Sequence, residues 1–250
     1  MSIINRTVAW LTWRQLFANR RLYLALAFAL TPVIVTLLFR WLVPEKGIEG
    51  AAGFFLVIQK EVIVGTLLPI AAVVFGTSAF GGEMDDGTLV YLLVKPVPRW
   101  TVVLSKYVVA VSATTLVMLV AIFGSWYALG VAELPFAAPK AYFYGTLVGA
   151  VLYSALFVML GIATKRSLIV GLFYVIAFEA VLSRSAPGTR ALSIREFANT
   201  VTLKTADPWL NLGAPTLSTT NIVYGGAFFL IGGLAFAVWR LHRYQMAERL

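Results

Sequence analysis

Residues 107–129 read YVVAVSATTLVMLVAIFGSWYAL and contain no charged side chain. A helix needs about 20 mostly apolar residues to cross a bilayer, and this run is long enough. The hydrocarbon core holds no water, so a spanning segment must satisfy its own backbone hydrogen bonds, as a helix does. The run therefore predicts a transmembrane helix in an all-α membrane protein.

Five other apolar stretches meet or approach this length, at residues 22–43, 62–80, 142–163, 168–182 and 222–239. The stretch 168–182 is the weakest because it is short and contains Glu179. Composition agrees, since 60% of the 250 residues are hydrophobic and 12% are charged. A soluble domain is about half apolar and about one quarter charged. We predict one polytopic domain over residues 1–250 with six transmembrane helices.

Basic residues indicate the orientation. Cytoplasmic loops of membrane proteins are enriched in Lys and Arg. Arg20 and Arg21 precede the first stretch, and Lys165 and Arg166 lie in the short turn 164–167. We therefore expect a multi-pass protein of the cytoplasmic (inner) membrane with both termini in the cytoplasm. The net charge of +9 is dispersed between apolar runs, which does not favour a nucleic-acid partner.

Two connecting segments have helical patterns of their own. In residues 1–21, Trp10 and Trp13 share a face, although Arg6 lies there too, which favours an interfacial helix over a loose basic tail. In residues 183–221, Ser193 and Glu196 have the spacing of a capping box before an apolar face. This pattern predicts a short helix packed on the outer membrane face.

Several kinds of chemistry are missing. The sequence has no Gly-Lys dipeptide, so it has no Walker A loop, and we expect that the chain is not itself an enzyme. It has no Cys and one His, His242, so we expect neither a metal site nor a cofactor on this chain. Glu179 is the only ionisable residue well inside a predicted span, which makes it a functional candidate. The alternative is that Glu179 lies near the outer interface and pairs with Arg184.

The loop 82–98 and its flanks, GGEMDDGTLVYLLVKPVPRWTVVLSK over 81–106, is the most informative stretch. An acidic cluster precedes a short helix, and the positive end of the helix dipole favours negative charge at that position. Leucines at i, i+3 and i+4 give that helix an apolar face. A glycine allows a hinge, prolines end the helix, and two basic residues are expected to anchor the next span at the lipid phosphates. These residues are Glu83, Asp85, Asp86, Gly87, Leu89, Leu92, Leu93, Pro96, Pro98, Arg99 and Lys106.

The pattern alone fits either a docking element or an interfacial helix without a partner. However, the order of residues resembles the cytoplasmic loop of ABC-2 type permeases. The layout is also similar to that family, whose transmembrane domain is type V exporter-like. It looks most like the small single-domain permeases of the NosY-like group, whose ATPase is a separate polypeptide. The residues that carry the resemblance are Glu83, Gly87, Thr88, Leu89, Leu92, Leu93, Pro96, Arg99 and Lys106.

The resemblance implies a permease subunit in a homodimer, or paired with a related permease, surrounded by membrane lipids. A separate ABC ATPase would carry the ATP and Mg. The loop would be the coupling helix, and residues 1–21 the connecting helix. The expected ATPase contacts are Glu83, Asp85, Asp86, Gly87, Thr88, Leu89, Leu92 and Leu93, with Lys165 and Arg166 as a second contact and Pro96, Arg99 and Lys106 anchoring the loop. Glu83 is equally expected to pair with a basic residue of its own bundle.

Three functions remain open at this point. The first is transport of a substrate, powered by the ATPase. The resemblance implies that the direction is export. The second is a non-transporting membrane anchor, or a mechanical or sensory unit, for an ATPase. The third is a stand-alone channel or an ion-coupled carrier, which would depend on Glu179. The residues do not identify a substrate.

Overall fold

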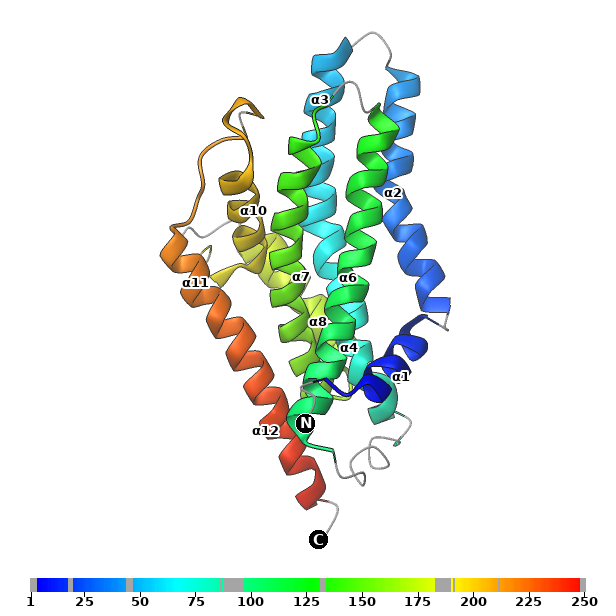
Figure 1. Cartoon of the computed structure of the whole chain (residues 1–250), viewed down its shortest axis with the longest axis vertical. Helices are drawn as coiled ribbons and strands as arrows, with labels where there is room; N and C mark the ends of the chain where they lie inside the picture. Colours follow the sequence, from blue (N-terminus) through cyan, green and yellow to red (C-terminus); the bar gives the residue numbers. More distant parts are fainter. Residues whose placement is uncertain are drawn as a thin grey trace.

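The computed structural model describes residues 4–17, 20–43, 47–85, 87, 97–130, 134–182, 190, 192–210 and 212–247. Within these ranges all regular structure is helical (Figure 1), so the predicted all-α class is confirmed. In chain order the elements are α1 (Arg6–Phe17), α2 (Arg20–Leu42), α3 (Gly47–Val57), η2 (Ile58–Leu67), α4 (Leu68–Asp85), α6 (Arg99–Leu129), α7 (Ala137–Ala163), α8 (Ser167–Phe173), η3 (Tyr174–Leu182), α10 (Ile194–Thr205), η5 (Pro208–Leu210), α11 (Thr219–Ala227), η6 (Phe228–Gly232) and α12 (Gly233–Ala247).

Helix length and composition identify the candidate spans. Four helical stretches of the described chain are long and apolar enough to cross a membrane: Gly50–Met84, Arg99–Leu129, Ala137–Ala163 and Thr219–Arg243. Two shorter apolar helices, Leu26–Leu42 and Ser167–Glu179, overlap the other two predicted stretches. Six crossings remain a prediction, whereas the helical segments themselves are observed.

The second predicted span is part of a much longer helix. The chain is helical without a break from Gly47 to Asp85, through α3, the π-helical η2 and α4. The charged pair Lys60 and Glu61 interrupts the apolar run but not the helix. Glu61 forms an ion pair with Arg195 at 2.9 Å, so its charge has a partner inside the fold. Near the top of this helix, Phe54 stacks on Phe39 of α2 with ring centroids 3.8 Å apart.

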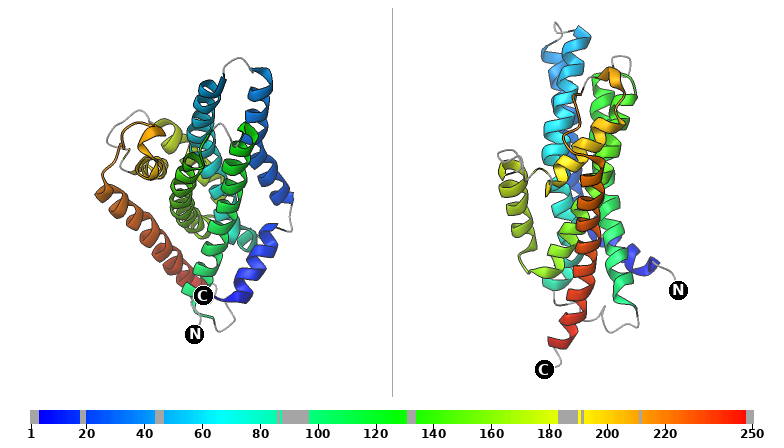
Figure 2. Two further views of the ribbon diagram at one scale, coloured as in Figure 1. Left: turned by 45° about the horizontal axis from the view of Figure 1, so that its top comes forward. Right: turned by 90° about the vertical axis from the view of Figure 1, so that its left-hand side faces the viewer.

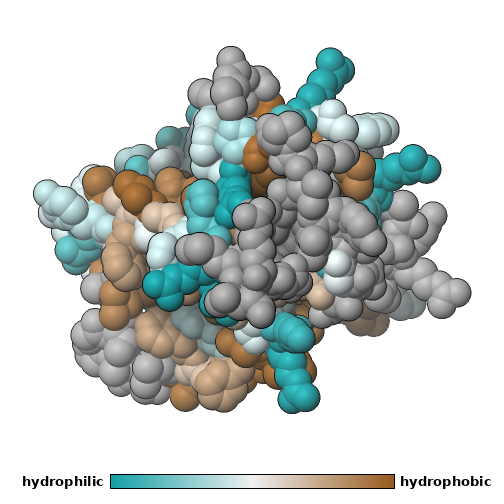
Figure 3. Space-filling view, turned by 90° about the horizontal axis from the view of Figure 1, so that it is seen from below, coloured by the Kyte–Doolittle hydropathy of each residue, from teal (hydrophilic) through white to brown (hydrophobic). Residues whose placement is uncertain are grey.

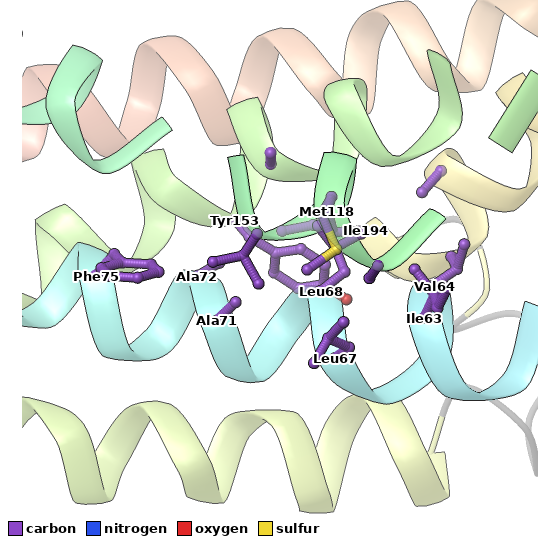
Figure 4. Packing of buried hydrophobic residues seen from close by; sticks show 14 of the residues in the cluster. Ile63, Val64, Leu67, Leu68, Ala71, Ala72, Phe75, Met118, Tyr153 and Ile194 are labelled. Carbon is purple, nitrogen blue, oxygen red and sulfur yellow. The ribbon is translucent and has the colours of Figure 1, made fainter. Parts of the chain in front are cut away.

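The core lies where α4 and η2 meet α6, α7 and α10. Figure 4 shows η2 and α4 side chains, from Ile63 to Phe75, beside Met118 of α6, Tyr153 of α7 and Ile194 of α10. Small residues allow close helix approach. A Cβ at Gly76 of α4 would lie 2.6 Å from the Cβ of Phe157, so this position needs glycine.

The last helical stretch, α11–η6–α12, contacts the rest of the fold at both ends. Its α11 end meets α10, where Lys204 donates to the Thr219 hydroxyl, and its α12 end approaches α6 and α7 (Figures 1 and 2). Its outward side chains are highly exposed, as for Tyr224 (74%) and Phe228 (68%). Leu241 of α12, by contrast, is fully buried. Large exposed apolar faces require lipid or another protein to cover them.

Helix α1 lies across the lower end of the bundle as drawn in Figure 1, the end where both chain termini are found. Its buried side chains are Val8, Thr12 and Leu16, one face at helical spacing. Trp10 is 66% exposed, on the opposite side. The helix therefore packs on the protein through one face and leaves Trp10 on the outward side, as an interfacial helix would.

The predicted capped helix of segment 183–221 is α10, and the hydroxyl of Ser193 accepts a hydrogen bond from the Glu196 N–H at 3.2 Å. That this helix lies on the outer membrane face stays a prediction. It packs against the side of α7, where a Cβ at Gly145 would lie 2.5 Å from the Ala198 carbonyl oxygen. Gly145 and Gly149 open a groove on α7 that accepts α10, and sequence spacing alone does not reveal this pairing.

Candidate functional site

The predicted loop begins at a buried ion pair. The Nζ of Lys106, on α6, lies 2.8 Å from Oε1 of Glu83, on the last turn of α4. The Lys106 side chain is 1% exposed and that of Glu83 is 14% exposed. Lys106 also donates to the Ala79 carbonyl and lies over the Phe80 ring, 4.6 Å from its centroid. Lys106 thus points into the bundle, and the expectation that it reaches the lipid phosphates is wrong.

The residue before Lys106 holds the start of α1. The backbone N–H of Asn5 donates to the Ser105 hydroxyl at 2.9 Å. The Asn5 side chain accepts from the Thr7 and Val8 N–H groups, at 3.0 and 3.4 Å, and so caps α1. The first turn of α1 is therefore fixed to α6 one residue away from the ion pair.

Arg99, at the first residue of α6, holds the end of α12. Its Nη1 donates to the carbonyl oxygens of Leu241 and His242, at 3.4 and 3.2 Å, and lies 3.2 Å from His242 Nδ1. A cation near carbonyls at the end of a helix is electrostatically favourable. Arg99 thus contacts protein, rather than lipid phosphates alone as the sequence suggested.

These contacts make residues 99–106 a junction, which we call the α6 base. From this single stretch, Arg99 contacts α12, Ser105 contacts α1 and Lys106 contacts α4. Beneath the polar contacts lies one apolar cluster that draws residues from all these helices and from α7. Its members include Val8, Phe80, Val102, Val103, Val158 and Leu241.

Much of the predicted coupling segment lies outside the described residues. This applies to Asp86, Thr88, Leu89, Leu92, Leu93 and Pro96, and to the side chain of Asp85, the last residue of α4. Gly87 is described: it is exposed, with φ +66°, and its N–H reaches the Met84 carbonyl at 3.4 Å. A left-handed glycine at that point ends α4. Glu83, near the start of the segment, is therefore held by Lys106 of the α6 base, and the α6 base itself begins at Arg99, directly after the end of the segment.

The second predicted contact, Lys165 and Arg166, is an exposed turn between α7 and α8 at the same end of the bundle. A cavity of about 240 Å³ separates this turn from the end of α4. Gly81 and Gly82, directly before Glu83, line it, together with both basic residues. Seen from below, hydrophilic and hydrophobic residues alternate over the described surface of this end (Figure 3). The structure thus places the described start of the first predicted segment close to the second.

Glu179 lies elsewhere, and its described partners include the first residues of α10. It is 1% exposed and accepts hydrogen bonds from the Ser193 hydroxyl at 2.6 Å and the Ile194 N–H at 3.0 Å. The hydroxyl of Tyr174 donates to it at 3.3 Å. The carboxylate therefore holds the N-terminus of α10, where the helix dipole favours an anion. Arg184, the alternative partner, lies outside the described residues.

Sequence reasoning missed the Ser105 contact, the α12 contact of Arg99 and the Glu61–Arg195 ion pair. Asn5 did offer a signal, because Asn is a preferred N-cap and an apolar helical pattern follows it. The Cβ of a residue at position 65 would lie 2.8 Å from Arg195 Nη2, so Gly65 leaves the room for that guanidinium. In the described ranges no group of three or more His, Asp or Glu side chains could hold a metal ion.

Comparison with known proteins agrees with the loop pattern. A family model described as ABC-2 family transporter protein matches residues 7–186, most of the chain. This range contains α1, Glu83, the α6 base and the turn at Lys165, and it ends before α10. A search of curated proteins finds no match. The chain therefore belongs to the ABC-2 transporter family and is a multi-pass membrane protein of the permease-subunit type.

Proposed function

We propose that this chain moves a substrate outward across the cytoplasmic membrane, driven by a separate ATP-hydrolysing subunit that binds at the lower end of the bundle. Both chain termini would then be cytoplasmic. ATP and Mg would be bound by the ATPase, because this sequence has no Walker A loop. The observation that carries the proposal is the α6 base, which directly follows the loop, binds Glu83 at the start of the loop and contacts α1 and α12.

The contacts suggest how a movement of the ATPase would reach the spans. A force on residues 82–98 would act on Glu83, near the start of that segment, and on Arg99, which directly follows it. Glu83 would pass it to α6 through Lys106, which is also bonded to α4 at Ala79. Arg99 would pass it to the end of α12. Charge-assisted hydrogen bonds in a buried setting are short and directional, so they can transmit a tilt.

We further propose that two such chains associate within the membrane. The support is the large apolar surface on α8 and η3, where Ile169, Phe173 and Ile176 are 63%, 72% and 62% exposed. The α11–η6–α12 stretch has a comparable surface. The bilayer covers part of these surfaces, and a second permease, the same or related, would cover another part.

A cross-linking experiment tests the ATPase contact. The chain has no Cys, so one introduced cysteine reports on one position. Lys165→Cys places it on the exposed turn, and Lys140→Cys, on an exposed residue near the opposite end of α7, is the matched control. Membranes from the native host are treated with a short bifunctional cross-linker. We expect an ABC ATPase to be captured from position 165 and not from 140. Capture from 140 alone would overturn the proposed orientation.

A further inference from the structure

A second polar region lies away from the α6 base. A cavity of about 590 Å³ opens between the upper part of the long Gly47–Asp85 helix, α7 and α10. Figure 1 shows these elements together in the upper half of the bundle. Small-molecule sites have volumes of about 300–1,000 Å³ and combine an apolar wall with a few polar groups. Here Leu56, Val57 and Leu203 form part of the apolar wall.

Charges of both signs line the cavity. The cations are Lys60 of η2 and Arg190, and the anions are Glu61 of η2 and Glu196 of α10. Both carboxylates have protein partners that fix them. Glu61 lies 2.9 Å from Arg195, and Glu196 accepts from the Thr216 hydroxyl at 3.1 Å. The Lys60 side chain, in contrast, is exposed and has no ion pair or hydrogen bond with any other described residue.

Asn199 adds an uncharged polar group to the lining. It lies on α10, lines the cavity and is only 9% exposed. Its side-chain amide offers both a donor and an acceptor to a bound molecule.

We propose that this cavity binds a zwitterionic group, with its anionic end at Lys60 and Arg190 and its cationic end at Glu196, since Glu61 is already paired with Arg195. A simple anion would be repelled by Glu196, and a simple cation by the two basic residues. The apolar wall suits an amphiphile such as a phospholipid with an ammonium headgroup. A soluble zwitterion has the same charged groups without the chains. The inference does not depend on ATPase coupling, because it concerns a different region.

Binding to the purified full chain in an uncharged maltoside detergent tests the proposal. Three probes are used: dihexanoyl phosphatidylethanolamine, dihexanoyl phosphatidylglycerol, which lacks the ammonium, and glycerophosphoethanolamine, which lacks the chains. We expect the first to bind about tenfold or more tightly than the second, as one lost charged hydrogen bond would predict. Binding of glycerophosphoethanolamine with equal affinity indicates a soluble ligand. Its failure to bind, beside a binding lipid, indicates a lipid ligand.

Two variants locate the binding in this cavity. Lys60→Gln, at an exposed side chain, and Asn199→Leu should each weaken phosphatidylethanolamine binding about tenfold. Lys140→Gln removes an exposed cation of α7 that does not line the cavity, and it should leave binding unchanged. Equal affinity for the two lipids, no binding of any probe, or unchanged binding in Lys60→Gln would each overturn the proposal.

Discussion

The ion pair between Glu83 and Lys106 makes a quantitative prediction. Its atoms are 2.8 Å apart and Lys106 is almost fully buried, so Glu83→Gln leaves an ammonium inside the bundle without its carboxylate. Removing one partner of a buried pair costs about 3–5 kcal/mol. Glu83 keeps 14% of its side chain exposed, so we expect the lower end of that range, about 3 kcal/mol. For a chain of this size that corresponds to a melting temperature lower by about 6–12 °C.

A double variant separates stability from coupling. Replacing both partners by residues of similar shape is often close to neutral, so Glu83→Met with Lys106→Met should recover most of the stability. Stimulation of the partner ATPase by the permease should remain low, because the bond that links the loop to α6 is gone. The control is Asp207→Asn, a carboxylate-to-amide change at an exposed residue that follows α10.

The assay measures the ATPase rate of the reconstituted complex beside the melting temperature of the permease alone. We expect the Glu83→Gln variant to insert, to melt earlier and to lose most of its stimulation. Wild-type stimulation in a folded Glu83→Gln variant would refute the reasoning that Glu83 transmits movement. Recovery of both properties in the double variant would mean that the pair only maintains packing.

Three other predictions concern single contacts. Arg99→Ala removes the hydrogen bonds to the end of α12, so hydrogen exchange there should rise while exchange in α10 stays unchanged. Gly145→Val would drive a side chain into the Ala198 carbonyl, so the melting temperature should fall by several degrees, whereas Gly232→Ala, which has open space, should leave it nearly unchanged. Glu179→Gln should weaken the capping of α10 by about 1–2 kcal/mol, seen as faster exchange over residues 194–198, and unaltered exchange there would contradict the capping role.

The helices could be predicted from the sequence because their cause is local. Apolar runs near the thickness of a bilayer indicate each long helix, and Ser193 with Glu196 indicated the start of α10. The same reasoning placed the start of the second apolar stretch at residue 62, whereas the helix there continues without a break from Gly47. Lys60 and Glu61 look like the end of a span, but Glu61 is paired with Arg195, more than a hundred residues away in the chain.

The site could be predicted only as a set of residues. The loop pattern identified Glu83, Arg99 and Lys106, and the possibility that Glu83 pairs within its own bundle is what the structure shows. The loop pattern could not show which residues these side chains contact. The contacts of Ser105 with Asn5 and of Arg99 with α12 join parts of the chain that lie far apart in sequence. The interpretation of Lys106 failed for the same reason, since its burial depends on how α4 packs against α6.

The central claim is that the chain works with a separate ATPase, and affinity purification tests it most directly. The tagged chain is isolated from its native host in mild detergent, with light cross-linking in a parallel sample, and co-purifying proteins are identified and counted. The account predicts one ABC ATPase for each permease chain. If the chain came out alone, and remained alone after cross-linking, the coupling role of the α6 base would be contradicted.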